Sequence, residues 1–262
     1  MIKEDVKFQD SVVFEGMTSI RSIIKGVETG VNDRKIEKIL YDKNKYAKNA
    51  KNIGYLKAVS KNMNFDVLGT DSTRIKDITL GTSHGGIVAI AKKRTIPCLS
   101  QDTKIVDNGF YCMLDGIEDP YNFGYTLRSL YACGCNGIVL PERNWMNAAG
   151  VVARSSAGAS ELFSLFTASP EIAAEFFQQH GYSVVCADER TDNILGECEL
   201  KLPILLIVGG EKRGISKNIL DKTDMLIKIN YAREFNASLS AASATTMFAY
   251  EIMRQNKNTA SF

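Results

Sequence analysis

Apolar and amphipathic stretches alternate along the second half of the chain. The apolar segments that predict strands are FYCMLDGI (110–117), GIVLPE (137–142), YSVVCA (182–187) and LPILLIVGG (202–210). The amphipathic segments that predict helices are NFGYTLRSLYACG (122–134), PEIAAEFFQQHG (170–181) and SLSAASATTMFAYEIMRQ (238–255). Strands that are apolar throughout and alternate with helices are typical of a parallel sheet covered on both faces. We therefore expect an α/β fold whose ligands bind beyond the carboxyl ends of the strands.

The first part of the chain has a different pattern. Apolar residues at helical spacing lie at 20–27, and short strands are predicted at 35–41, 65–68 and 85–91, with a lysine-rich helix between the first two strands. This indicates a small α/β domain. The polar, proline-containing segment KKRTIPCLSQDTK (92–104) has the composition of a connector. The expected division is therefore one domain over residues 1–100 and a second over 105–262.

Charge supports this division. Residues 1–104 contain 19 Lys and Arg against 12 Asp and Glu, whereas residues 105–262 contain 13 against 18. Much of the basic charge lies in RKIEKILYDKNKYAKNAKNIGYLKAVSK (34–61), where Arg34 and eight lysines are interspersed with tyrosines. Lysines displace counterions from phosphates and aromatic rings stack on bases, so the segment suits RNA; a merely solvated helix face is the alternative interpretation.

Composition excludes several classes. The 262 residues are 45% apolar and 24% charged, and no run of 18 apolar residues occurs, which favours a globular cytoplasmic protein without a membrane partner. The sequence starts without the basic and apolar zones of a signal peptide. Six scattered cysteines, with only Cys133 and Cys135 close together, predict reduced thiols and no metal site.

One short motif indicates a ligand. VGGEKRGIS (208–216) follows the most apolar predicted strand, and its paired glycines indicate a close approach to the backbone. The spacing matches neither the phosphate-binding G-x-x-x-x-G-K-[ST] loop nor G-x-G-x-x-G. Glu211 would repel a phosphate but suits a cationic ligand such as S-adenosylmethionine.

Three segments in order carry a family resemblance: LDGIEDPYNFGYTLRSLYACG (114–134), LLIVGGEKRGIS (205–216) and INYAREFNASLSAASATTMFAYE (229–251). They resemble the three motifs of the SpoU/TrmH branch of the SPOUT RNA methyltransferases. FEGMTSIRSII (14–24) and SHGGIVAI (83–90) resemble that family's substrate-binding domain, which is related to ribosomal proteins that bind bent RNA. The resemblance implies a deep trefoil knot in the C-terminal domain, a homodimer and S-adenosylmethionine as cofactor.

The resemblance also implies site residues. The expected catalytic residues are Asn122, Arg128, Glu211, Ser238 and Ser240. The expected cofactor-binding residues are Val208, Gly209, Gly210, Ile229 and Leu239, largely through main-chain groups, with the two glycines leaving room for the nucleoside. Ser240 stands where many relatives have asparagine.

The expected activity is methylation of a ribose 2′-hydroxyl, in ribosomal RNA because the N-terminal domain resembles a ribosomal-protein module. The alternatives are a transfer RNA substrate, methylation of a base, and a noncatalytic RNA-binding protein on the same scaffold. Physical chemistry makes Arg128 a phosphate and alkoxide ligand rather than a base, since guanidinium stays protonated.

Overall fold

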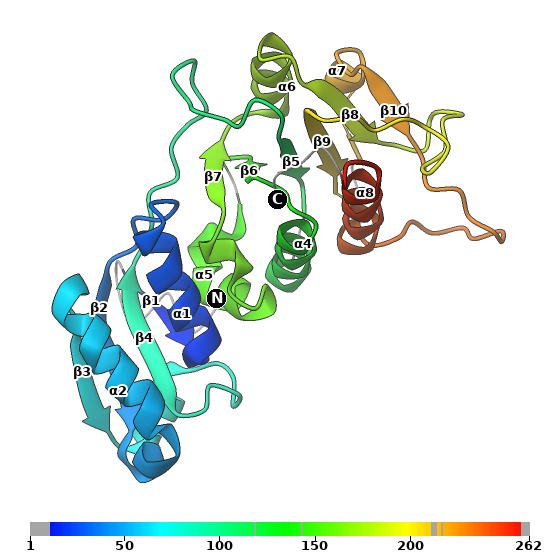
Figure 1. Ribbon diagram of the computed structural model, residues 1–262. Helices are drawn as coiled ribbons and strands as arrows, with labels where there is room; N and C mark the ends of the chain where they lie inside the picture. Colours follow the sequence, from blue (N-terminus) through cyan, green and yellow to red (C-terminus); the bar gives the residue numbers. More distant parts are fainter. Residues whose placement is uncertain (1–10, 118, 143, 211–213, 216, 258–262) are drawn as a thin grey trace. The chain divides into compact units, whose positions relative to one another are not determined.

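The computed structural model describes residues 11–117, 119–142, 144–210, 214–215 and 217–257. The chain divides into two compact units (Figure 1). The first comprises residues up to 95 together with 145–162, and the second comprises 96–144 and the residues from 163 onward. The first break lies in the predicted connector, but the return of residues 145–162 to the first unit differs from the expected division.

The first unit is built on a four-stranded sheet with strand order β1-β4-β2-β3. Its strands are β1 (Ser11–Glu15), β2 (Ile36–Asp42), β3 (Asp66–Thr70) and β4 (Ile87–Lys92), and only β2 and β3 pair in parallel. Its helices are α1 (Gly16–Glu28), the short η1 (Lys43–Lys45), α2 (Tyr46–Met63) and α3 (Ser72–Ile78). Ile20, Ile23 and Ile24 of α1 are buried, as their helical spacing predicts.

Residues 145–162 contain η2 (Trp145–Ala148), α5 (Ala149–Ser155) and η3 (Ala159–Glu161). Helix α5 packs against β1, and η3 packs against α1. Nearly every residue of α5 is buried, so this segment completes the core of the first unit. That apolar burial is the physical reason why the segment belongs with residues distant in sequence.

The second unit contains a six-stranded sheet in the order β10-β8-β9-β5-β6-β7, and every pairing within it is parallel. The strands are β5 (Phe110–Asp115), β6 (Gly137–Leu140), β7 (Ser164–Thr167), β8 (Ser183–Ala187), β9 (Ile204–Gly209) and β10 (Met225–Ile227). The helices are α4 (Pro120–Ala132), α6 (Pro170–Gln179), α7 (Lys217–Leu220) and α8 (Ala241–Gln255). The predicted α/β fold with a parallel sheet is thus confirmed.

Local sequence signals set the ends of these helices. The side chain of Asp119 caps α4 by accepting from the Asn122 N–H, and Ser169 caps α6 in the same way. Proline opens each of these two helices, at a position where the missing N–H costs nothing. Helix α4 packs along α8, and Thr246 donates from its hydroxyl to Ser129 across that contact at 2.8 Å.

Among the helices in the described ranges, none is long and apolar enough to cross a membrane. The cysteines are all unpaired, and four of them are buried. Burial raises the pKa of the Cys186 thiol to about 11, so this thiol stays protonated at neutral pH.

Candidate active site

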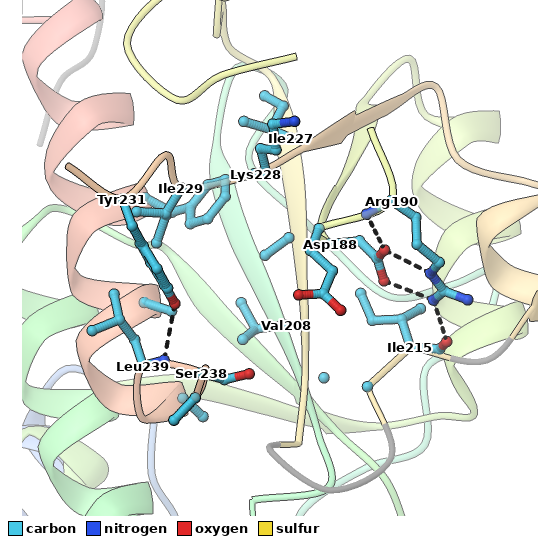
Figure 2. A pocket seen from close by; sticks show the side chains of 18 of the residues that line it. Asp188, Arg190, Val208, Ile215, Ile227, Lys228, Ile229, Tyr231, Ser238 and Leu239 are labelled. Carbon is cyan, nitrogen blue, oxygen red and sulfur yellow. Dashed lines mark hydrogen bonds and ion pairs between the residues drawn. The ribbon is translucent and has the colours of Figure 1, made fainter. Parts of the chain in front are cut away.

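A cavity of about 980 Å³ lies in the second unit, where β8, β9 and β10 end (Figure 2). The residues that follow these strands form its walls, and the first turn of α8 closes one side through Ala241 and Ala244. The carboxyl edge of a parallel sheet is where α/β proteins bind ligands. The volume lies at the upper end of the roughly 300 to 1,000 Å³ typical of small-molecule sites.

All five residues predicted to hold a cofactor line this cavity: Val208, Gly209, Gly210, Ile229 and Leu239. They come from two separate parts of the chain. Val208 is buried at the end of β9, whereas Ile229 and Leu239 flank the irregular segment between β10 and α8. The structure therefore brings the second and third motifs together in one cavity; a role in binding remains a prediction for each residue.

The paired glycines lie close to other backbone groups of the chain. A Cβ on Gly209 would lie 2.5 Å from the carbonyl carbon of Gly214, and a Cβ on Gly210 would lie 2.1 Å from the carbonyl oxygen of Gly116. The Gly214 N–H also donates to the Gly210 carbonyl at 2.9 Å. Backbone of the chain itself therefore approaches both glycines: Gly214 lies against Gly209, and Gly116 lies against Gly210.

One wall of the cavity is tied together by an ion pair. The Arg190 guanidinium donates from Nε and Nη2 to the two Asp188 carboxylate oxygens, each at 2.7 Å, and Nη2 also reaches the Ile215 carbonyl at 3.2 Å (Figure 2). The hydrogen bonds from Arg190 lower the pKa of Asp188. A link therefore runs from the end of β8 to the loop after β9, which carries the second motif.

The remaining charged groups of the cavity indicate which ligands it suits. Lys228 Nζ lies 3.5 Å from Asp192 Oδ1, and Arg190 forms an ion pair with Asp188. Glu189 also lines the cavity and is exposed, and no ion pair joins it to a residue in the described ranges. With its neighbours paired, the carboxylate of Glu189 is available to a positively charged ligand.

The predicted catalytic residues do not all lie in this cavity. Ser238 lines it. The Ser240 hydroxyl accepts from the Ser243 N–H at 3.2 Å and so caps α8. Glu211 lies outside the described residues.

Asn122 and Arg128 lie on α4 and are not among the residues that line the cavity. Asn122 is half-buried in the first helical turn, and Arg128 is exposed without an ion pair to any residue in the described ranges. Six residues along a helix separate two side chains by about 120° around the axis and about 9 Å along it. Within one copy of the chain, therefore, the two residues lie on different sides of α4, and neither lines the cavity.

The lysine-rich segment of the first unit leaves the lysines of η1 and α2 exposed at its surface. Its exposed lysines on η1 and α2 are Lys43, Lys45, Lys48, Lys51, Lys57 and Lys61. Tyr46 is exposed beside them, and Arg21 lies 4.5 Å from the ring centre of Tyr55. Arg34 does not share this surface, because it is buried in an ion pair with Glu161.

Some cavity residues were not predicted from the sequence. Asp188, Glu189 and Arg190 follow β8, and Tyr231 and Phe235 lie between β10 and α8. The signal that could have found the first group is its position at the end of a predicted apolar strand, where α/β sheets place their ligand-binding loops.

The fold and the cavity define a class of protein: α/β proteins that bind their ligand beyond the carboxyl ends of a parallel sheet. Residues 109–250 match the model of the SpoU rRNA Methylase family. The 23S rRNA (guanosine-2′-O-)-methyltransferase RlmB of Shewanella oneidensis is 30% identical over 181 residues, which span 68% of this chain and 73% of that protein. The chain belongs to the SpoU rRNA methylase family, and the resemblance predicted from the three motifs is confirmed.

Further relatives agree with this assignment. A protein of Staphylococcus haemolyticus named for the TrmH family of tRNA/rRNA methyltransferases is 31% identical over 144 residues, and this match spans only 57% of that protein. Among solved structures, the AdoMet-bound rRNA methyltransferase of Sinorhizobium meliloti shares the fold with a TM-score of 0.77 at 22% identity, over 97% of this chain and 89% of that one. The methyltransferase AviRb of Streptomyces viridochromogenes, in complex with AdoMet, has a TM-score of 0.74 at 21% identity, over 96% and 92% of the two chains.

Proposed function

We propose that this protein transfers a methyl group from S-adenosylmethionine to a ribose 2′-hydroxyl of ribosomal RNA. The observation that carries the proposal is the cavity at the ends of β8, β9 and β10, which is lined by all five residues that the motifs predict to hold the cofactor. The RlmB relative, named as a 2′-O-methyltransferase of 23S rRNA, supports both the ribose and the ribosomal RNA.

The groups around the cavity fit S-adenosylmethionine. The sulfonium and the ammonium of this cofactor are cationic, and the cavity includes the exposed carboxylate of Glu189, which forms no ion pair with a residue in the described ranges. Main-chain groups at Gly209, Ile229 and Leu239 supply donors and acceptors for the nucleoside. When bound, the cofactor supplies an activated methyl group.

The chain's own residues orient the RNA nucleotide. A fixed near-attack geometry between two reactants contributes about 7 to 11 kcal/mol to catalysis. Arg128 grips the phosphate of the target nucleotide and stabilises the negative charge that develops on the ribose oxygen. Because guanidinium keeps its protons at accessible pH, the hydroxyl proton leaves through phosphate or water. Asn122 and Ser238 orient the nucleotide, and Ser240 together with Glu211, which lies outside the described residues, completes the catalytic residues of the proposal.

A homodimer explains how Arg128 reaches a cavity that its own helix does not line. The packed helices α4 and α8 present several exposed apolar side chains: Tyr121, Tyr125 and Tyr131 on α4, and Met247 and Tyr250 on α8. Contiguous exposed apolar side chains mark an interaction surface. We propose that two copies of the chain associate through this face.

We also propose that the first unit binds RNA. The second unit, in the same proposal, contains a trefoil knot.

The function is tested with purified protein, tritiated S-adenosylmethionine and total RNA from cells that lack the protein. Label should enter ribosomal RNA and should remain in dinucleotides after alkaline hydrolysis, because a 2′-O-methyl group blocks cleavage. Label in transfer RNA, or on a base, would replace the substrate assignment. Tight cofactor binding without transfer to any RNA would establish a binding protein.

The cofactor site needs a variant that leaves the glycine loop intact. Ala244 lines the cavity from α8, and Ala244→Leu fills that space with a larger side chain. We expect calorimetry to show at least about a tenfold loss of S-adenosylmethionine affinity, since the side chain occupies ligand volume. Ser243→Leu, on the exposed side of the same turn, is the matched control and should bind normally. Equal affinities in both variants would contradict the placement of the cofactor.

A further inference from the structure

Two aromatic side chains stand exposed at the mouth of the cavity. Tyr231 is 38% exposed and Phe235 is 60% exposed, yet both line the cavity. They belong to the segment between β10 and α8, in which every residue from 230 to 238 is exposed. Aromatic rings that are exposed to solvent beside a ligand cavity are typical contact surfaces for a binding partner.

Local contacts fix the position of one ring. The Leu239 N–H donates to the Tyr231 hydroxyl at 3.1 Å, which anchors the tyrosine to the start of α8 (Figure 2). The two ring centres lie 6.1 Å apart with an interplanar angle of 60°. Tyr231 is therefore pre-positioned, and Phe235 contacts it through an edge-to-face arrangement that leaves most of the phenylalanine in solvent.

We propose that Tyr231 and Phe235 form a stacking site for the nucleobase of the nucleotide that is methylated. This inference rests on the proposed function and adds a recognition site to it. RNA-binding proteins bind unstacked bases on exposed aromatic rings, because every base has a flat π face. Arg233 lies between the two aromatics in sequence, is exposed, and forms no ion pair with a residue in the described ranges, so a phosphate can approach beside the base.

The depth of the residues favours an RNA base over the adenine of the cofactor. Val208 and Ile227, at the strand ends, are buried, whereas the aromatic pair lies at the solvent side of the same cavity. A macromolecule enters from solvent and cannot be enclosed, while a free cofactor can reach the floor. A base held at the mouth extends its ribose toward the floor, where the 2′-hydroxyl has to meet the methyl group.

The variants are Phe235→Ala, Phe235→Leu and Tyr231→Ala in the full-length protein. Leucine keeps an apolar contact but removes the ring face, so it tests stacking itself. Ile172→Ala is the control, since Ile172 is 54% exposed on α6 and does not line the cavity. We expect both Phe235 variants and Tyr231→Ala to raise the KM for ribosomal RNA by roughly five- to a hundredfold, the range for loss of one stacked base. In the two Phe235 variants, the affinity for S-adenosylmethionine and the molecular mass in solution should not change; Tyr231→Ala also removes the acceptor of the Leu239 N–H, so only its KM for RNA is compared.

A second readout does not depend on methylation. A single-stranded oligonucleotide that contains 4-thiouridine is irradiated with the protein, and the crosslinked peptide is identified by mass spectrometry. A crosslink within residues 229–240 that disappears in Phe235→Leu supports the site even if no RNA is methylated, in which case only the proposed function fails. A fall in cofactor affinity in the Phe235 variants would identify the rings as an adenine platform. A change in mass in these variants would identify them as a subunit contact, and an absent crosslink with unchanged KM would show no base contact. Each of these three results overturns the proposal.

Discussion

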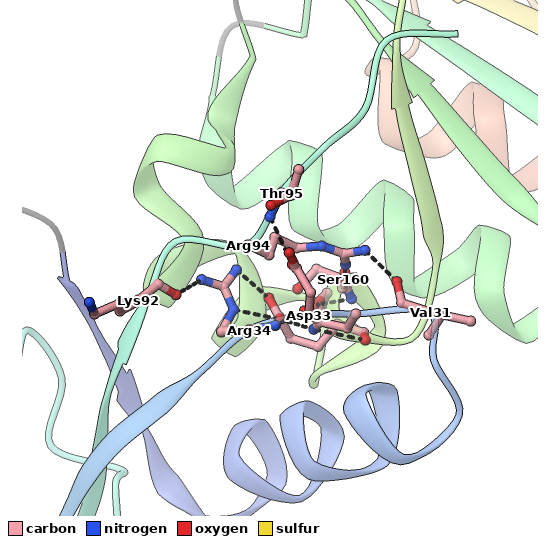
Figure 3. A network of polar contacts seen from close by, with 10 residues as sticks. Val31, Asp33, Arg34, Lys92, Arg94, Thr95 and Ser160 are labelled. Carbon is pink, nitrogen blue, oxygen red and sulfur yellow. Dashed lines mark hydrogen bonds and ion pairs between the residues drawn. The ribbon is translucent and has the colours of Figure 1, made fainter. Parts of the chain in front are cut away.

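At the scale of single residues, the contact with the largest expected effect on stability is the ion pair between Arg34 and Glu161, because both charges are buried. Both side chains are at most 1% exposed, Arg34 Nε lies 2.8 Å from Glu161 Oε2, and Asn32 donates to the same oxygen at 2.6 Å. Figure 3 shows Arg34, which also donates from Nη1 to the Lys92 carbonyl at 2.8 Å. Glu161→Gln leaves the guanidinium buried without a counter-charge and should lower the free energy of unfolding by about 3 to 5 kcal/mol.

Urea denaturation followed by far-ultraviolet circular dichroism measures this change, because both units contain helices and contribute to the signal. The control is Glu199→Gln. Its partner Lys201 is 75% exposed and Glu199 itself 68%, so its loss should cost no more than about 1 kcal/mol. Similar effects in the two variants would show that the buried pair contributes little.

Ser240 is a second case at this scale. Its hydroxyl caps α8, and asparagine at the same position caps a helix equally well. We expect Ser240→Ala to lower the free energy of unfolding by about 1 kcal/mol and Ser240→Asn to leave it unchanged. If Ser240→Asn also keeps full methyl transfer, capping accounts for the residue; a loss of turnover at unchanged stability would give Ser240 a chemical role.

At the scale of elements, the link from Asp188 through Arg190 to Ile215 joins the end of β8 to the loop after β9. Arg190→Lys keeps the charge but loses the planar two-pronged contact, so the loop loses its anchor. We expect a five- to tenfold weaker affinity for S-adenosylmethionine, or about 1 to 1.4 kcal/mol, measured by calorimetry. Arg254, which forms a similar pair with Glu251 away from the cavity lining, provides the control variant Arg254→Lys.

The same link predicts a pH dependence. The pKa of Asp188 is lowered by the hydrogen bonds from Arg190, so its carboxyl group is more acidic in the folded protein than in the unfolded chain. Its stabilising contribution is therefore complete above about pH 4 and is lost as the pH falls through the lower, folded-state value. Cofactor affinity should not change between pH 5 and 8 because of this group; a change in that window that is absent from Asp188→Asn would contradict the assignment.

The elements also show how far sequence patterns reach. Long apolar or amphipathic segments such as 202–210 and 170–181 specified their strand and helix, because burial enforces their period. The strand β10 has only three residues, and β7 (SLFT) has two apolar residues between Ser164 and Thr167, whereas β6 (GIVL), of the same length as β7, has no polar side chain and was predicted. The glycines at 209 and 210 signalled a close approach, but only the structure identifies Gly214 and Gly116 as the groups that approach. Likewise, no local pattern relates Arg34 to Glu161.

At the scale of the whole molecule, RNA affinity should depend on the exposed lysines of η1 and α2. Replacing Lys43, Lys45 and Lys48 by alanine should weaken RNA binding and lower the slope of log affinity against log salt by about 0.7 to 0.9 for each phosphate contact removed. Filter binding at several salt concentrations measures the slope. The control replaces Lys201, Lys222 and Lys257, which are exposed on the second unit. Equal slopes in both triple variants would contradict the proposal that the first unit binds the RNA.

The experiment uses the complete chain for a structural reason. Removing residues 1–95 would take away the strand that α5 covers and the arginine that neutralises Glu161. The remaining fragment would then contain a buried segment without its core. Weak RNA binding by such a fragment would report misfolding as readily as a lost binding surface.

The path of the chain between the units has a consequence for protein synthesis. The polypeptide leaves the first unit after residue 95, returns at 145 and leaves again after 162. Arg34 therefore emerges from the ribosome 127 residues before Glu161 does. At about 5 to 20 residues per second, the nascent arginine waits roughly 6 to 25 seconds for its counter-charge. By then β5 and β6 have been made, while β9, which pairs with β5 on its other side, has not. The first unit therefore cannot complete its core until residue 162 has been made, when the second unit is already partly synthesised, and the second unit is completed only later.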